Sequence, residues 1–219
     1  MEEINKKHKI LNLGAALIVG VIVICIAVTV TVLARPLYYF DIEHLKIPEA
    51  SGYSEEECRI NYDSLIEYNL IGGESELTFP TLHMSEEGRI HFEEVKSIFI
   101  AMQILALLGI VALAAWIVYL RKKGASKGRT LWMRLTGIVT LALAVIVALA
   151  MLIDWQWAFE TMHKIFFQND YWIFNSFTDP VIKILPDTFF FHCGILIIIL
   201  VVIQLITLEL LYRRLNNGR

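Results

Sequence analysis

The 219-residue sequence lacks the patterns that most often identify enzymes and nucleic-acid-binding proteins. It has no glycine-rich nucleotide-binding loop, no Gly-x-Ser-x-Gly nucleophile elbow and no repeat at the periods of solenoid proteins. It also has no basic arm with interleaved aromatic residues. The usual sequence evidence for nucleotide binding, serine hydrolysis and nucleic-acid binding is therefore missing, and we expect no nucleic-acid partner.

Cysteine is scarce, with Cys25 in an apolar run, Cys58 in an acidic segment and Cys193 at the start of another apolar run. Isolated cysteines are more often buried and inert than paired. The sequence leaves open whether Cys58 is paired, because nothing in it shows that two cysteines lie close together. Histidines and carboxylates do not follow the spacing of metal ligands, so we expect no metal and no other cofactor.

Charged residues are rare in four long apolar runs of a chain that is 57% hydrophobic. The predicted membrane spans are residues 10–34, 96–120, 135–153 and 189–212. As α-helices, runs of this length can cross about 30 Å of hydrocarbon. The first run exceeds the core of a signal peptide and has no small-x-small cleavage site before Arg35-Pro36, so we expect an uncleaved helix.

Charge is distributed unevenly among the connecting segments. The first loop, 35–95, has fourteen acidic and four basic residues, and the second loop, 154–188, has five and two. The hairpin 121–134 has six basic residues and no acidic one, and both termini carry Lys or Arg. Because basic segments stay in the cytoplasm, both termini are predicted inside and both acidic loops outside. We expect one all-α integral membrane domain over residues 1–219.

The first loop is expected to fold into a small extracellular cap. Ser54 and Glu57 have the spacing of a capping box, which predicts a short helix through about Tyr68. Residues 77–82 are expected to be extended. Ser85 is then predicted as the N-cap of a helix that continues into the second span.

The second loop is rich in aromatic residues, which predicts short helices in the headgroup layer. Nine lie between residues 155 and 177: Trp155, Trp157, Phe159, Phe166, Phe167, Tyr171, Trp172, Phe174 and Phe177. Asp179-Pro180 has the pattern of an N-cap and first helical position. Pro186-Asp187 is expected to end that short helix and start the fourth span.

Two histidines are candidate acid/base groups, since imidazole titrates near pH 6.5. His91 lies near the start of the helix predicted after Ser85, and Glu94, at i+3, could orient its ring. His163 lies in the aromatic loop, with Glu160 at i−3. The plainer interpretations are a solvated helix residue for His91 and an interfacial polar residue for His163. The predicted topology places both on the outer face.

The residues around both histidines resemble those of a known family. The stretch His91-Phe92-Glu93-Glu94-Val95-Lys96 resembles the His-x-x-Asp-Val-Lys signature of the lipoprotein intramolecular transacylases of Gram-positive bacteria. The second loop also resembles the family at Phe159, His163, Phe166-Phe167, Trp172-Ile173-Phe174, Thr178-Asp179-Pro180, Leu185-Pro186 and Phe189-Phe190. Two departures are Glu94, where the family usually has Asp, and the run Glu86–Arg89.

The resemblance implies an acyltransferase. Members of the family move one acyl chain of a diacylglyceryl-modified lipoprotein from the glycerol to the α-amine of the N-terminal cysteine, which gives a lyso-form lipoprotein. It implies that the catalytic residues are His91 and His163, with supporting or orienting roles for Glu94, Glu160, Arg89, Trp172 and Asp179. The implied partners are lipoproteins and membrane lipid. Ester-to-amide transfer is downhill, so the reaction requires neither nucleotide nor metal.

Two alternatives stay open from the sequence. One is a non-enzymatic membrane sensor or assembly factor whose acidic loop binds a partner. The other is a lipid hydrolase that transfers the acyl chain to water. The expected location is the bacterial cell membrane, with both termini in the cytoplasm and the active site at the outer leaflet. The sequence does not assign the base and oxyanion-stabilising roles between the histidines.

Overall fold

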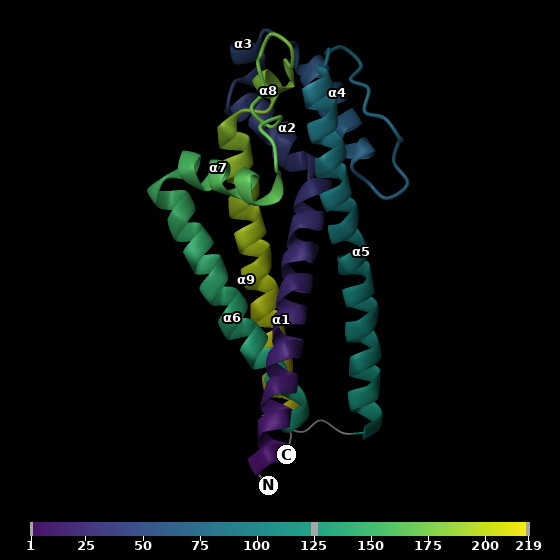
Figure 1. Cartoon of the computed structure of the whole chain (residues 1–219), viewed down its shortest axis with the longest axis vertical. Coiled ribbons are helices and arrows are strands. Elements are labelled where there is room, and N and C mark those ends of the chain that lie inside the picture. The colour runs from purple at the N-terminus through teal and green to yellow at the C-terminus, as the bar shows by residue number, and fades with distance from the viewer. Residues whose placement is uncertain (1, 124–126, 218–219) are drawn as a thin grey trace. The chain divides into compact units, whose positions relative to one another are not determined.

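The computed structural model describes residues 2–123 and 127–217, and their regular structure is entirely helical (Figure 1). The helices are α1 (Glu2–Leu33), α2 (Arg35–His44), α3 (Ile47–Ser51), α4 (Glu55–Tyr68), α5 (Glu86–Lys123), α6 (Lys127–Ile153), α7 (Trp155–Phe166), α8 (Val181–Ile184) and α9 (Asp187–Asn217).

Among the described residues, four helices are long and apolar enough to cross a membrane, as predicted. The apolar segments are Lys9–Leu33, Glu86–Leu120, Thr130–Ile153 and Asp187–Asn216. The helix that contains the second predicted span begins at Glu86, directly after the predicted cap Ser85. Residues 124–126 of the predicted hairpin lie outside the described residues.

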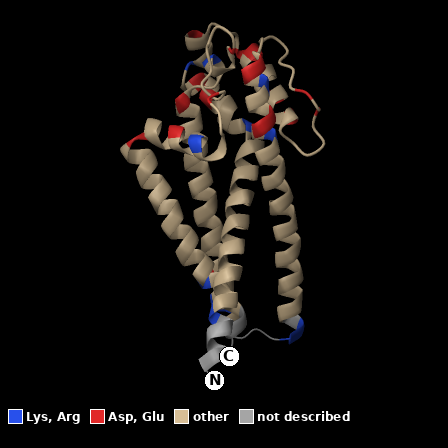
Figure 2. Cartoon of the chain, in the orientation of Figure 1, with Lys and Arg blue, Asp and Glu red and all other residues tan. Residues whose placement is uncertain are grey.

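The chain divides into two compact units. The first, here the span unit, comprises Met1–Val28, Ile104–Leu149 and Ile197–Arg219. The second, here the site unit, comprises Thr29–Gln103 and Ala150–Leu196. Acidic residues gather on the short helices and loops of the site unit, and the basic residues of the span unit lie at helix ends (Figure 2).

Two polar side chains in the span unit bond to main-chain carbonyls of neighbouring helices. The Thr136 hydroxyl donates to the Ala16 carbonyl at 3.2 Å. The Gln204 amide donates to the Val23 carbonyl at 3.2 Å. Such bonds satisfy polar groups where no water is present.

The core of the site unit is built around two tyrosines. Tyr38 of α2 stacks on Tyr62 of α4 with ring centroids 3.9 Å apart, and both contact Phe189 at the start of α9. The buried Tyr38 hydroxyl donates to the carbonyl of Ile184 in α8 at 2.8 Å. Aromatic packing and one buried hydrogen bond thus tie the first loop to the second.

Local sequence signals explain where the helices of the site unit begin. The capping box of Ser54 and Glu57 is present, and α4 ends at Tyr68, as predicted. Asp154 separates α6 from α7, and its carboxylate accepts a hydrogen bond from the Trp157 amide at 2.9 Å. Figure 1 shows α7 lying across the end of α6. This turn brings the aromatic sequence of α7 into the site unit.

Candidate active site

His91 enters the site from the second turn of α5. His91 is only 5% exposed to solvent. Its ring lies between those of Phe167 and Phe174, with centroid distances of 4.7 Å and 5.4 Å. Its Nδ1 atom is buried and has no hydrogen-bond partner among the described residues. A buried ring nitrogen without a partner is costly to maintain and is available to a ligand.

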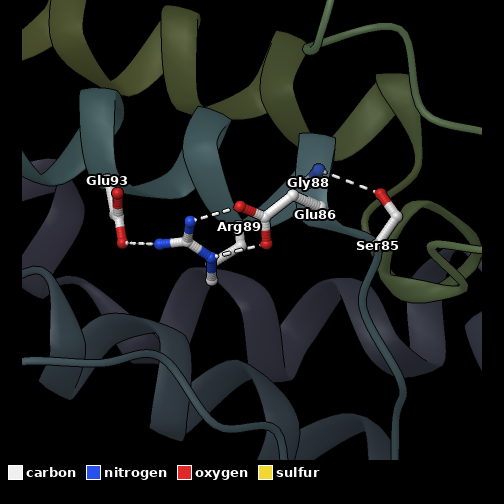
Figure 3. A network of polar contacts seen from close by, with 5 residues as sticks. All are labelled: Ser85, Glu86, Gly88, Arg89 and Glu93. Atoms are coloured by element: carbon white, nitrogen blue, oxygen red, sulfur yellow. Dashed lines mark hydrogen bonds and ion pairs between the residues drawn. The ribbon is translucent and has the colours of Figure 1, made fainter.

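The start of α5 is fixed by contacts that hold His91 in place. The Ser85 hydroxyl accepts a hydrogen bond from the Gly88 amide at 3.0 Å, which confirms Ser85 as the cap (Figure 3). The Ser85 amide donates to the buried carboxylate of Asp179 at 2.8 Å. A side chain on Gly88 would meet that carboxylate, because a Cβ there would lie 2.3 Å from Asp179 Oδ1.

Asp179 does not cap α8, although the sequence pattern predicted that it would. The N-cap of α8 is Pro180, which makes no side-chain capping bond. The Asp179 side chain turns away from α8 because it accepts from the Ser85 amide and, at 2.7 Å, from the Thr178 hydroxyl. The prediction of Asp179 as a cap was thus wrong. The residue joins the second loop to the start of the helix that carries His91.

His163 enters the site from the last turn of α7. Its Nδ1 lies 2.8 Å from the carbonyl oxygen of Phe159, one turn earlier in the helix. His163 is 9% exposed to solvent. A carbonyl can only accept, so Nδ1 carries the proton and Nε2 keeps its lone pair in the neutral ring. The ring of Trp172 stacks on His163 at 4.7 Å with an interplanar angle of 25°.

The protonation of His163 follows from its surroundings. Burial lowers the pKa of His163, because the charged ring loses hydration. The hydrogen bond to the Phe159 carbonyl raises the pKa but offsets only part of this effect. His163 is therefore biased toward its neutral form, which is the form that accepts a proton.

The two histidine rings lie close together although they come from segments far apart in the sequence. Their centroids are 6.2 Å apart with an interplanar angle of 35°, and Phe167 contacts both rings. At this separation two imidazoles can act on different atoms of one ester group. The structure thus brings together the two histidines that the sequence selected.

Glu94 faces the second loop rather than serving His91. Its Oε1 accepts a hydrogen bond from the amide of Asn169 at 2.9 Å, and its Oε2 is buried without a partner among the described residues. Asn169 was missed in the sequence, where its position between Gln168 and Asp170 carries no recognisable signal.

The other two predicted supporting residues make contacts on the surface. Arg89 pairs with Glu86 and Glu93 along the exposed side of α5 (Figure 3). Glu160 accepts from Gln156 at 2.9 Å and pairs with Lys164 at 3.2 Å. The polar contacts of Arg89 and Glu160 thus go to neighbours on their own helices and not to the histidine rings.

The structure also shows the contacts of His192 and the state of the cysteines. His192, at the start of α9, bonds through Nδ1 to both carboxylate oxygens of Asp41 at 2.9 Å. The Asp41 side chain is fully buried. Cys58 is free, as are Cys25 and Cys193.

Comparison with known proteins gives consistent matches. A sequence model of the family described as lipoprotein intramolecular transacylase Lit matches residues 13–190. An in meso structure of the membrane integral lipoprotein intramolecular transacylase Lit from Bacillus cereus is similar to this chain, with 31% identity and a TM-score of 0.87. That match covers 96% of both chains.

Two other structures of the Bacillus cereus protein also match at 31% identity, each with a TM-score of 0.80. One carries a histidine-to-arginine mutation, and the match covers 96% of this chain and 92% of that chain. The other carries a histidine-to-alanine mutation, with coverage of 96% and 94%. A search of curated proteins gave no match.

Proposed function

The chain belongs to the Lit family of lipoprotein intramolecular transacylases and is an acyltransferase, and we propose that His163 and His91 carry out its chemistry. The proposed reaction moves an acyl chain from the glycerol of a diacylglyceryl lipoprotein to the α-amine of its N-terminal cysteine. The observation that carries this assignment is the pair of buried imidazoles 6.2 Å apart.

His163 is the proposed base. The α-amine has a pKa near 8 in water, so it first releases its extra proton to solvent, and the neutral amine then loses one more proton as it attacks the ester carbonyl. The Nε2 lone pair of His163 is available for that proton because Nδ1 is engaged with the Phe159 carbonyl. The new C–N bond forms as the proton moves to Nε2. The lowered pKa of His163 supports this role by favouring the neutral ring.

His91 is the proposed electrostatic partner. Attack on the ester places negative charge on the carbonyl oxygen, which a hydrogen-bond donor must stabilise. His91 lies beside His163 and has a ring nitrogen without a partner among the described residues. When the intermediate collapses, the ester C–O bond breaks and the glycerol oxygen receives the proton that His163 had taken. Atoms and protons then balance within one substrate molecule.

The remaining contribution is orientation. Ester and amine belong to one molecule, so the enzyme gains most by holding them at the attack distance. Trp172 and Phe167 pack against the His163 ring and exclude water from it. Excluding water also favours transfer to the amine over hydrolysis.

Replacing either histidine tests the proposal. In His163→Ala and His91→Ala we expect N-acylation to fall by about a thousandfold or more, because proton transfer or oxyanion stabilisation is lost. Mass spectrometry of lipoprotein N-terminal peptides measures the lyso-form product. His44→Ala is the matched control, since His44 is an exposed histidine of the same unit. Unchanged product in either active-site variant contradicts the assignment, and release of free fatty acid indicates a hydrolase.

The protein is membrane-integral, and we place its termini in the cytoplasm and its active site at the outer leaflet. The support is the contrast between the basic hairpin and termini and the acidic loops of the site unit. A membrane-impermeant maleimide on intact cells tests the orientation. Ser75→Cys is expected to be labelled and Lys122→Cys to be protected, and the reverse pattern contradicts the placement.

A further inference from the structure

One buried carboxylate oxygen in the site unit has no hydrogen-bond partner in the part of the chain that the structure describes. Glu94 lies three residues after His91 on α5, so both project from the same face of the helix. Its Oε1 is held by the Asn169 amide at 2.9 Å, whereas Oε2 is buried without a hydrogen bond from any described residue. A buried carboxylate oxygen is costly unless a donor or a cation reaches it.

The bond to Asn169 also fixes where the free oxygen is presented. Asn169 follows Phe167 by two residues, and Phe167 contacts the rings of both His91 and His163. The segment that packs against both imidazoles therefore also supplies the donor that holds Glu94. The bond from Asn169 thus holds the carboxylate against the segment that packs on both imidazoles and leaves Oε2 for a further donor.

The neighbouring carboxylates do not offer such a group. Glu93 is exposed and paired with Arg89. Glu160 is bonded to Gln156 and Lys164. Asp179 accepts from Ser85 and from Thr178 through its two oxygens. Among these, Glu94 alone combines burial, a fixed position and an oxygen without a partner.

We propose that Glu94 is the binding residue for the α-amine of the substrate cysteine, and that Asn169 is its positioning residue. This inference rests on the proposed function, because only an N-terminal substrate brings a free α-amine to the site. The amine carries three N–H donors when protonated and two when neutral, so it can bond to Glu94 in both states. Glu94 takes no proton in the reaction. It holds the nitrogen while His163 accepts the proton that is released.

A binding measurement separates this role from catalysis. The probes are two dialkylglyceryl-cysteine peptides with ether in place of ester linkages, one with a free α-amine and one N-acetylated. Neither can react. At pH 7 we expect the wild-type protein to bind the free amine about tenfold to a hundredfold more tightly, as for a hydrogen bond to a charged group. In Glu94→Gln this preference is lost and the affinity for the N-acetylated peptide is unchanged.

Matched variants make the result specific. Glu93→Gln removes the adjacent carboxylate on the exposed side and is expected to keep the full preference. Asn169→Ala is expected to reduce the preference, because Glu94 is then no longer held in position. If Glu94→Gln keeps the wild-type preference, the proposal is overturned.

The same measurement remains decisive if Glu94→Gln fails to fold. In the wild-type protein the preference for the free amine should decrease by several fold between pH 7 and pH 9.5, as the amine loses its charge. A preference that is absent at pH 7 overturns the proposal without any variant.

The proposed function fails by a different result. If His163→Ala still transfers the acyl chain, the catalytic assignment is wrong, whatever the peptides show. If His163→Ala is inactive but retains the preference for the free amine, both proposals are supported. Loss of that preference in Glu94→Gln, with unchanged affinity for the N-acetylated peptide, supports the amine site, whereas an unchanged preference overturns it.

Discussion

The span unit and the site unit satisfy their buried polar groups in different ways. In the span unit, Thr136 and Gln204 donate to main-chain carbonyls of adjacent helices, and no ionisable group takes part in these bonds. In the site unit, ionisable side chains take part as well: the buried Asp41 carboxylate contacts His192 Nδ1, and Glu94 accepts from the Asn169 amide. The first arrangement only joins helices, whereas the second keeps ionisable groups away from water.

This difference shows how one chain can both insert into a membrane and hold the ionisable groups that a reaction needs. Hydrogen bonds between helices within a membrane are weak, about 0.6 kcal/mol on average, so losing one is tolerated. A buried charge that loses its partner costs several kcal/mol. Polar substitutions should therefore be tolerated in the span unit and damaging in the site unit. The following predictions test this contrast, from the largest expected effect to the smallest.

The largest contrast compares Asp41→Ala with Thr136→Val. Asp41→Ala removes the fully buried carboxylate that His192 Nδ1 contacts at 2.9 Å and should lower the free energy of unfolding by about 3 kcal/mol, as for a lost hydrogen bond to a charged group. Thr136→Val removes the bond to Ala16 and should lower it by about 0.6 kcal/mol. Thermal unfolding in detergent micelles measures both. Equal losses in the two variants would remove the distinction between the units.

A second contrast uses two glycines that differ in their surroundings. Gly88→Ala places a methyl group 2.3 Å from Asp179 Oδ1, which is held by Ser85, so we expect a loss of about 2 kcal/mol. Gly137→Ala meets no atom within 4 Å and should stabilise α6 by up to about 1 kcal/mol. The two changes in melting temperature should thus have opposite signs. A stabilising Gly88→Ala argues against a fixed Asp179.

The smallest contrast concerns pH. Burial lowers the pKa of His163, so the base should stay neutral below its ordinary pKa of about 6.5 and lose activity only at lower pH. Trp172→Leu opens the ring to water and should return the pKa toward 6.5. The ratio of transfer rates at pH 6 and pH 7.5 should then fall by about threefold relative to wild type.

The span unit supplies the control for this pH measurement. Trp116→Leu changes a tryptophan of α5 that belongs to the span unit, and the ratio of rates should not change. Protonation of the substrate amine affects all variants equally, so it cancels in the comparison. If Trp172→Leu and Trp116→Leu give the same ratio, stacking on His163 does not control its protonation.

Much of the fold was predictable because its signals are local. Apolar runs give the four spans, and the capping box and Ser85 give the starts of α4 and α5. The resemblance to the family predicted His91 and His163 as the catalytic residues. The sequence could not show that the rings meet, because that contact depends on how α7 turns at Asp154 and on packing around Phe167.

The partners of the carboxylates were not predictable for a physical reason. Side chains three residues apart share a helical face, which made Glu94 a plausible partner for His91 and Glu160 for His163. The Glu94 carboxylate instead accepts a hydrogen bond from Asn169 of the second loop, which is a tertiary contact. Asp179 likewise bonds to Ser85, 94 residues earlier in the sequence. Long-range contacts of irregular segments leave no periodic signal.

The bond between His163 Nδ1 and the Phe159 carbonyl has a consequence for how this enzyme tolerates mutation. Histidine bases in many enzymes are oriented by a side-chain carboxylate, and removing that carboxylate disables them. Here the orienting atom belongs to the peptide chain, so replacing the side chain of residue 159 leaves the acceptor in place. A mutational scan of α7 should therefore find no second polar position as sensitive as His163. The proton-accepting residue depends on the helix itself, and only a change that breaks α7 would disorient it.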